Sequence, residues 1–243
     1  MKKQCANIAV LVSGGGTNLQ ALLDAEKSGI LKSGKIKIVI SNKEGAYALE
    51  RAKRAGVETA VVLKTKEGGR VAFEKEIMRL LDERDIDIIV LAGFMAILSA
   101  DFTGAYPERI INVHPSLIPS FCGEGFYGLR VHRAALDYGV KVTGATVHFV
   151  NEIPDGGRII MQKAVKIRDD DTPETLQKRV MRLAEWKILP AAVEKVSAGL
   201  ISKQVIITRQ SGKDSGGFHS GMSRKKASRK KSTEIISEQV EMG

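Results

Sequence analysis

Asn112 and His114 are the pair of residues whose types and spacing point most directly to chemistry. They alternate with Ile111 and Val113 in a predicted strand, so the period of two places both polar side chains on one face, and Pro115 ends the strand. An asparagine amide can donate to an oxygen that gains negative charge, and a histidine, whose ordinary pKa is about 6.5, can move a proton near neutral pH. The pair therefore predicts acyl-type chemistry at a strand end.

Asp155 is the candidate partner of His114. It lies in Pro154-Asp155-Gly156-Gly157, a predicted turn between two later strands, where its carboxylate could orient the imidazole and raise its pKa. The alternatives are structural, because a single histidine at a strand end is often a satisfied core or turn residue, and Asp-Gly is ordinary hairpin chemistry. From the residues alone, both interpretations stay open.

Three other residues of reactive types are given no catalytic part. His132 and His148 lack metal-ligand spacing. They are interpreted as packing residues or as groups that contact the catalytic residues rather than the substrate. Cys122 lies in a glycine-rich loop with no base paired to it, which makes a catalytic thiol a poor interpretation. No metal site is predicted.

A glycine loop, Ser13 to Asn18, lies between a predicted strand and a predicted helix. Glycines at such a junction let an anion approach unpaired backbone N–H groups at the positive end of the helix, so the loop predicts a phosphate site. Leu19 stands where the dinucleotide pattern needs a third glycine, and no Lys-Ser/Thr pair follows as the Walker pattern requires. A small phosphomonoester fits better than NAD or ATP, and a tight turn without a ligand is the alternative.

Alternating strands and helices must hold these groups. The predicted strands of the first part, rich in apolar residues, cover residues 8–12, 36–40, 59–63, 86–91 and 109–113. Helical periodicity follows the glycine loop and recurs over residues 46–55 and 71–84. This alternation predicts an α/β fold with a Rossmann-like, mostly parallel central sheet flanked by helices, whose ligands lie beyond the carboxyl ends of the strands. Two later strands, 143–150 and 159–165, are expected to pair with each other. A helix capped by Thr172 follows, and Pro190 and Gly199 are expected to interrupt it.

Composition narrows the class of protein. The 243 residues are 43% hydrophobic and 27% charged, which excludes disorder for most of the chain. The longest nearly unbroken apolar run, residues 88–98, is short beside the ~20 residues of a membrane helix. The two cysteines, Cys5 and Cys122, form no Cys-x-x-Cys pair, so reduced thiols in a cytoplasmic protein are expected.

The C-terminal part is basic and differs from the rest. Residues 209–243 carry eight Lys/Arg and four Asp/Glu with no apolar period, which predicts an enzyme domain over 1–208 and a disordered, flexible tail over 209–243. The clusters Arg224–Lys226 and Arg229–Lys231 suggest a nucleic-acid-binding protein as an alternative class. No aromatic residue lies between the clusters to stack on bases, so such binding is expected to be incidental.

Five ordered blocks resemble the phosphoribosylglycinamide formyltransferase family, folate-dependent enzymes of purine synthesis. The blocks span roughly residues 7–205 and comprise residues 12–20, Ser41-Asn42-Lys43, residues 91–95, residues 111–117 and Asp155-Gly156-Gly157. The resemblance implies the formyltransferase fold and transfer of a formyl group from 10-formyltetrahydrofolate to the amine of glycinamide ribonucleotide, with no metal. Asn112, His114 and Asp155 match the family's catalytic trio.

The resemblance also implies binding residues. Those matched to the ribonucleotide site are Gly16, Thr17, Asn18 and Glu185. Those matched to the folate site are Arg70, Met95, Ala96, Ile97, Leu98 and Asn112. Two departures bear on folate affinity and loop closure: Ala96 stands where many members have arginine, and the loop Ser120 to Gly128 is longer than in the shortest members.

Other folate-dependent enzymes with the same Asn-x-His-Pro-Ser core are the nearest rivals. They include the methionyl-tRNA formyltransferase type and the formyltetrahydrofolate deformylase type. The methionyl-tRNA type carries a substantial second domain, whereas only about 35 residues remain here after the enzyme domain. The glycine loop also favours a small phosphorylated substrate. Small-molecule substrates and no membrane partner are therefore expected.

Overall fold

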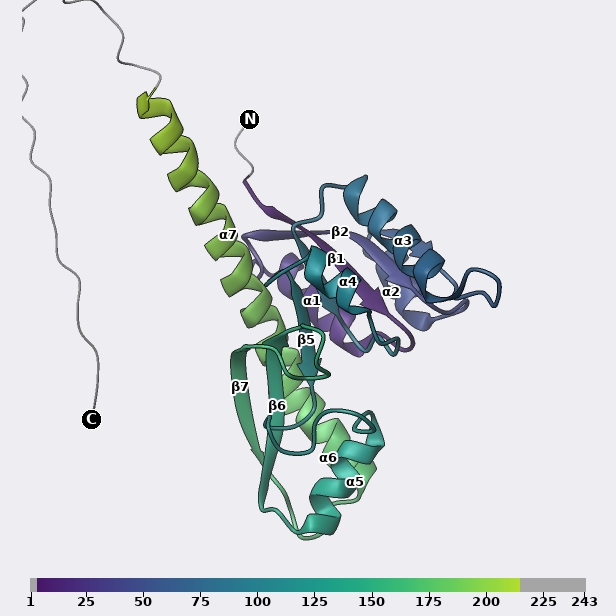
Figure 1. Cartoon of the computed structure of the whole chain (residues 1–243). Helices are drawn as coiled ribbons and strands as arrows, with labels where there is room; N and C mark the ends of the chain where they lie inside the picture. Colours follow the sequence, from purple (N-terminus) through teal and green to yellow (C-terminus); the bar gives the residue numbers. More distant parts are fainter. Residues whose placement is uncertain (1–3, 215–243) are drawn as a thin grey trace, which may run out of the picture. The chain divides into compact units, whose positions relative to one another are not determined.

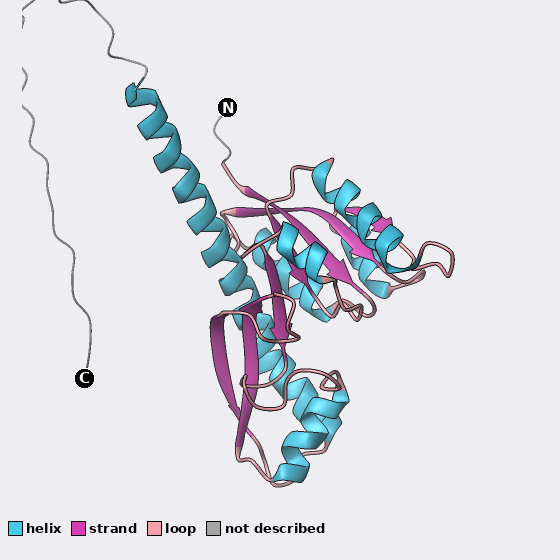
Figure 2. Cartoon of the chain, in the orientation of Figure 1, coloured by secondary structure: helices cyan, strands magenta, loops and turns pink. Residues whose placement is uncertain are grey.

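The computed structural model describes residues 4–214, with side chains described for residues 4–203. The chain divides into two units, Met1–Ile206 and Ile207–Gly243. Of the second unit only the part up to Asp214 is described, and it continues helix α7 (Trp186–Asp214). The first unit consists of one sheet with helices packed on both faces (Figure 1, Figure 2).

One sheet of seven strands organises the described residues, in the order β3-β2-β1-β4-β5-β6-β7. The strands are β1 (Ala6–Val12), β2 (Gly34–Ser41), β3 (Glu58–Val61), β4 (Ile88–Leu91), β5 (Ile110–His114), β6 (Val142–Phe149) and β7 (Ile159–Lys166). All pairs from β3 to β5 are parallel, whereas β6 runs antiparallel to β5 and to β7. The predicted mostly parallel sheet is confirmed, and so is the pairing of the two later strands.

Helices cover both faces of this sheet. They are α1 (Thr17–Lys27), α2 (Tyr47–Arg54), α3 (Gly69–Asp82), α4 (Ala100–Ala105), α5 (Leu129–Tyr138), α6 (Pro173–Val180), the π-helix η1 (Met181–Glu185) and α7. On β1, Ile8 and Val10 pack in the same cluster as α1 and α2, while Ala9 and Leu11 pack in the other cluster with α3 and α4. Because both faces are covered, the central strands are apolar without alternation.

The order of the sheet reverses between β1 and β4, which is where open α/β sheets form their ligand crevice. The glycine loop follows β1, and the segment with Met95 follows β4. The two segments touch, because the Met95 N–H donates to the Ser13 hydroxyl oxygen at 2.8 Å. β5 ends beside β4. The edge predicted to bind ligands therefore gathers the glycine loop, the Met95 segment and the end of β5.

The last helices differ from their prediction. The capping residue is confirmed, since the Thr172 hydroxyl accepts from the Thr175 N–H. The expected interruptions are wrong, because α7 runs through Pro190 and through Gly199 to Asp214. Pro190 is the fifth residue of α7 and follows the wide turn η1, a place where the missing N–H costs one helical bond only. A glycine inside a helix costs about 1 kcal/mol, which packing can offset.

The division into an enzyme domain and a tail remains a prediction. The proposed boundary at residue 208 falls inside α7, so Arg209 to Asp214 are helical. Residues 215–243, with both basic clusters, lie outside the described residues. Among residues 4–214, no helix is long and apolar enough to cross a membrane.

Candidate active site

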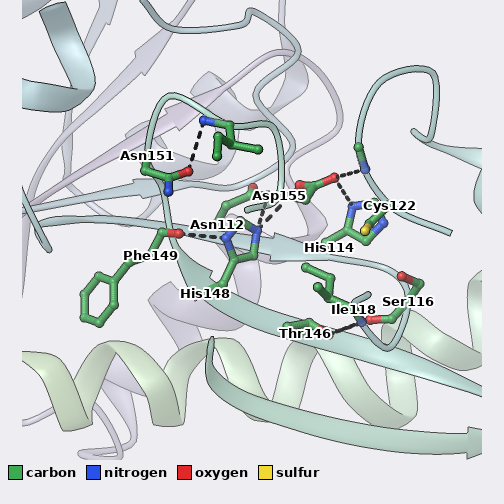
Figure 3. Close-up of polar contacts among 12 residues, drawn as sticks. Asn112, His114, Ser116, Ile118, Cys122, Thr146, His148, Phe149, Asn151 and Asp155 are labelled. Carbon is green, nitrogen blue, oxygen red and sulfur yellow. Dashed lines mark hydrogen bonds and ion pairs between the residues drawn. The ribbon is translucent and has the colours of Figure 1, made fainter. Parts of the chain in front are cut away.

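Asn112 and His114 lie at the carboxyl end of β5, where the antiparallel strand β6 brings two further polar residues beside them. Asn112 is paired with His148 and His114 with Thr146. The period of two on both strands therefore sets four polar side chains next to one another (Figure 3). The register between β6 and β7 shifts at Val147/His148, and irregular strand pairing of this kind is common next to active sites.

Asp155 completes this group, which we call the β5–β6 cluster: Asn112, His114, His148 and Asp155. The Asp155 Oδ2 atom lies 3.3 Å from His114 Nδ1, and Oδ1 lies 3.6 Å from His148 Nε2. Asn112 Nδ2 is 3.2 Å from the same His148 nitrogen. Figure 3 shows Asp155 facing the two imidazoles. The structure thus brings together the three residues predicted to be catalytic and adds His148.

Backbone strain helps to place the carboxylate of Asp155. Asp155 has a φ of 54°, a conformation that non-glycine residues rarely adopt and that is often kept at functional sites. Its Oδ2 atom also accepts from the Gly123 N–H at 2.9 Å. At Gly157, a Cβ atom would lie 1.8 Å from the Phe149 carbonyl oxygen, so only glycine fits. The Asp-Gly-Gly turn is therefore required by this geometry and is not generic hairpin chemistry.

The pKa of His114 is lowered overall, although Asp155 acts to raise it as predicted. Burial is the largest cause, because only 4% of the residue is exposed and a charged imidazole is poorly solvated there. The charge of Asp155 and the Phe121 carbonyl oppose burial, and His148 adds to the lowering. The carboxylate thus acts in the predicted direction, but desolvation outweighs it.

The hydrogen bonds of His114 define where its protons can be. Nε2 lies 2.9 Å from the Phe121 carbonyl oxygen. A carbonyl oxygen only accepts, so Nε2 carries a hydrogen and Nδ1 faces Asp155. Burial alone would raise the pKa of Asp155, but the neighbouring His148 and His114 rings and the Gly123 N–H stabilise the carboxylate and lower the pKa overall. The space between Nδ1 and Oδ2 can therefore hold one exchangeable proton.

His148 is the residue whose part the sequence prediction understated. Its Nδ1 lies 2.8 Å from the Phe149 carbonyl oxygen, so Nδ1 carries the hydrogen. In the neutral ring, Nε2 is then an acceptor for the Asn112 N–H at 3.2 Å. His148 is 1% exposed. The sequence shows that Thr146 and His148 lie two residues apart on a predicted strand and so share a face. It does not show that this face lies beside Asn112 and His114, because that depends on the register between β5 and β6.

The glycine loop has the open backbone that an anion site needs. Gly16 has a φ of 71°, and a Cβ there would lie 2.6 Å from the Ala48 Cβ and 2.8 Å from its Cα. Gly14 and Gly15 have no atom within 4 Å of a Cβ position. Positive φ and close packing against α2 therefore fix glycine at position 16, while the two preceding glycines leave an open surface.

Asn18 and Glu185, both matched to the ribonucleotide, meet in the structure. Asn18 Nδ2 donates to Glu185 Oε2 at 2.7 Å, and both residues are buried. Burial raises the pKa of Glu185 to about 7, against which the Asn18 bond works. Glu185 ends the π-helix η1, and such wide turns are frequent at functional sites. The Asn18 Oδ1 atom is buried with no partner among the described residues.

The residues matched to folate lie along the segment after β4. Met95 and Ile97 are 52% and 72% exposed, whereas Leu98 is buried. Helix α3 packs beside them, since Phe73 stacks on Phe94 with ring centroids 6.4 Å apart. Arg70 is exposed in the first turn of α3, and within the described side chains no hydrogen bond or ion pair joins it to residues 95–98. Arg70 therefore lies on the helix that packs beside residues 95–98 but, in the part of the chain with described side chains, does not contact them through a hydrogen bond or ion pair.

The remaining reactive side chains stay outside this chemistry. Cys122 has a raised pKa, mainly through burial, and so little thiolate character. His132 is buried, neither ring nitrogen has a partner within residues 4–203, and burial lowers its pKa to about 4. Within the described part of the chain, no group of three or more His, Cys, Asp or Glu side chains could hold a metal ion.

The chain belongs to the formyl transferase family, whose sequence profile matches residues 6–193. Among its relatives, the phosphoribosylglycinamide formyltransferase of Escherichia coli strain K12 is 39% identical over 193 residues, which is 79% of this chain and 88% of that protein. The resemblance stated from the sequence is therefore confirmed.

Longer relatives and solved structures agree. The human trifunctional purine biosynthetic protein adenosine-3 is 46% identical over 200 residues, which is 82% of this chain and 19% of that protein. The chain thus spans about a fifth of the length of the first curated relatives it matches. The structure of glycinamide ribonucleotide transformylase 1 from Symbiobacterium toebii matches with a TM-score of 0.75 at 41% identity, covering 81% of this chain and 89% of that one.

Proposed function

We propose that this enzyme transfers the formyl group of 10-formyltetrahydrofolate to the amine of glycinamide ribonucleotide, in the cytoplasm, as a step of purine synthesis. The observation that carries the proposal is the β5–β6 cluster at the ligand edge of the sheet, next to a glycine loop with an open backbone. The names of relatives at 39 to 46% identity support the substrate assignment.

Asn112 supplies the hydrogen-bond donor to the formyl oxygen. The barrier to attack by a free amine lies in the negative charge that develops on that oxygen, and a fixed donor lowers it. The His148 Nε2 atom accepts one hydrogen of the Asn112 amide, which fixes the orientation of the amide. The second amide hydrogen is then available to the substrate. His148 is in this view a positioning residue for Asn112.

His114 and Asp155 handle the proton that the attacking amine must lose. The lowered pKa of His114 keeps the ring neutral near pH 7, so the pair can accept one proton between Nδ1 and Oδ2. The imidazolium that forms is paired with the carboxylate but remains poorly solvated, so it releases the proton readily to the leaving nitrogen. A water molecule held by Asp155 is an equivalent carrier. No covalent enzyme intermediate is required.

The two substrates are assigned to the two segments at the point where strand order reverses. We assign the ribonucleotide phosphate to Gly16, Thr17 and the first N–H groups of α1, and the rest of that substrate to Asn18 and Glu185. The pteridine-bearing co-substrate supplies the formyl group. The exposed side chains of Met95 and Ile97 fit a flat, largely apolar ring system, with Ala96, Leu98, Arg70 and Asn112 around it.

The decisive experiment mixes the purified protein with 10-formyltetrahydrofolate and glycinamide ribonucleotide and measures the deformylated folate. The proposal expects product only when both substrates are present, and expects loss of turnover in the Asn112→Ala variant. Turnover with formyl-accepting tRNA but not with the ribonucleotide, or hydrolysis without an acceptor, would instead support one of the two rival folate-dependent enzymes.

A further inference from the structure

Helix α2 holds the carbonyl groups of the glycine loop. The Ala48 N–H, at the start of α2, donates to the Gly14 carbonyl oxygen at 3.0 Å. Three residues later on the same helix, Arg51 Nε donates to the Gly15 carbonyl oxygen at 2.8 Å. Both carbonyl groups are therefore directed toward α2.

The direction of these carbonyls determines where the next N–H groups point. In a trans peptide the C=O of one residue and the N–H of the next are antiparallel, so the N–H groups of Gly15 and Gly16 point away from α2. Within the described residues no protein group accepts a hydrogen bond from either N–H. They are free donors in the loop that we assign to a phosphate.

The peptide between Gly15 and Gly16 has little else to fix it. Both of its residues are glycines, which adopt positive and negative φ with similar ease, and a Cβ at Gly15 would meet nothing within 4 Å. If this peptide rotated by half a turn, the Gly15 carbonyl would face the anion and repel it. The hydrogen bond from Arg51 is thus the contact that selects the donor-outward orientation.

Arg51 itself is held in place for this contact. Its Nη1 donates to Gln20 Oε1 on α1 at 2.9 Å, and its guanidinium lies over the Tyr47 ring, 4.9 Å from the centroid. In the part of the chain that the structure describes, Arg51 has no carboxylate within ion-pair distance. A charged donor on the Gly15 carbonyl also polarises the peptide, which strengthens the Gly16 N–H as a donor.

We propose that Arg51 is a positioning residue for the phosphate loop: its guanidinium holds the Gly15 carbonyl against α2 and so presents the Gly16 N–H to the phosphate of the substrate. The inference rests on the proposed function for the identity of that substrate. It extends that function to a side chain outside every motif identified in the sequence.

The chain offers a matched control in Arg54. It lies one turn further along α2, its guanidinium lies over the same Tyr47 ring at 5.7 Å, and it donates to the Tyr47 hydroxyl but has no bond to the loop. Arg51→Met and Arg54→Met remove the same charge from the same helix. They differ in the contact with Gly15 and in the bond to Gln20 that holds Arg51 in place.

The first test follows inorganic phosphate binding through the amide NMR signals of Gly15 and Gly16, without any reaction. We expect Arg51→Met to weaken binding about tenfold, the order expected for one charged hydrogen bond, and Arg54→Met to stay within about twofold of wild type. If both variants weaken phosphate binding equally, Arg51 acts only through its long-range charge and the proposal is wrong. If Arg51→Met does not weaken phosphate binding, the proposal is wrong as well. If Arg51→Lys restores full binding, charge rather than the guanidinium bond is responsible.

The second test uses turnover. Arg51→Met should raise the KM for glycinamide ribonucleotide about tenfold, with kcat and the KM for folate within about twofold, and the difference should vanish with glycinamide riboside, which lacks the phosphate. An equal loss with both acceptors would indicate a structural defect and contradict the proposal. If the wild-type enzyme does not turn over the ribonucleotide at all, the proposed function fails, while the phosphate titration still decides the role of Arg51.

Discussion

The glycine loop and the β5–β6 cluster lie at the same edge of one sheet but are built from different groups. The loop offers backbone N–H donors, and its geometry depends on the absence of a side chain at Gly16. The cluster consists of buried and half-buried side chains that fix one another's orientation through Asp155 and His148. Substitutions in the loop should therefore act on substrate binding, and substitutions in the cluster on the rate and its dependence on pH.

Asn112→Ala should give the largest effect, and it tests whether the β5–β6 cluster determines the rate. Removing one donor to a developing oxyanion typically costs about 10²-fold to 10³-fold in kcat. The KM for the ribonucleotide should stay nearly unchanged, because the loop is intact. Asn112→Asp keeps the shape without the donor and should lose as much. Activity within about threefold of wild type in steady-state assays would remove Asn112 from the mechanism.

Asp155→Asn should lower kcat by about 10²-fold, the lower end of general acid–base contributions. Without the carboxylate, the imidazolium of His114 loses its stabilising charge, so the pKa of His114 falls further and the acidic limb of the pH–rate profile moves to lower pH. Asp137→Asn, an exposed position on α5, removes the same charge as a control. An unshifted limb in kcat measured from pH 5 to 9 would leave Asp155 as a turn residue only.

Gly16→Ala should raise the KM for the ribonucleotide about tenfold and lower the free energy of unfolding by about 1–3 kcal/mol, because the new Cβ clashes with Ala48 and φ is positive. The structure directs a side chain at position 16 into α2. Gly15→Ala is the control, with open space around its Cβ. Urea unfolding and kinetics that do not distinguish the two variants would contradict this account.

Glu185→Gln should give the smallest effect, a change in how stability depends on pH. The folded protein holds the Glu185 proton up to pH about 7, whereas the unfolded chain releases it near the ordinary 4.5. Glu185 therefore contributes less stability as pH rises from about 4.5 to 7 and a constant amount above that. The free energy of unfolding of wild type relative to the variant should fall across this window. A constant difference in urea titrations would show that Glu185 is already ionised.

The architecture was predictable from the sequence because both faces of the strands are buried. Strand positions such as Ile8 to Val12 are apolar throughout, and the glycine and proline signals separate them from helices. Helix α4 was not predicted, since its six residues are too short for a period. The passage of α7 through Pro190 was missed because it depends on the π-turn before it.

The site was predictable only where neighbours in sequence are neighbours in space. Asn112 and His114 share a strand, so their common face follows from spacing. The position of His148 opposite Asn112 depends on strand register, and Arg51 reaches the glycine loop from another helix. The pKa of His114 depends on how completely the ring is buried, which no local pattern reveals.

The Phe149 carbonyl has a consequence for how mutational data on this enzyme would be interpreted. One oxygen atom both accepts the His148 Nδ1 hydrogen and occupies the space beside Gly157. A side chain at position 157 would displace that oxygen and so remove what distinguishes the two tautomers of His148. A variant at position 157 would lose activity because the hydrogen of the His148 ring would move to the wrong nitrogen. The distance between residue 157 and the substrate would not reveal this cause.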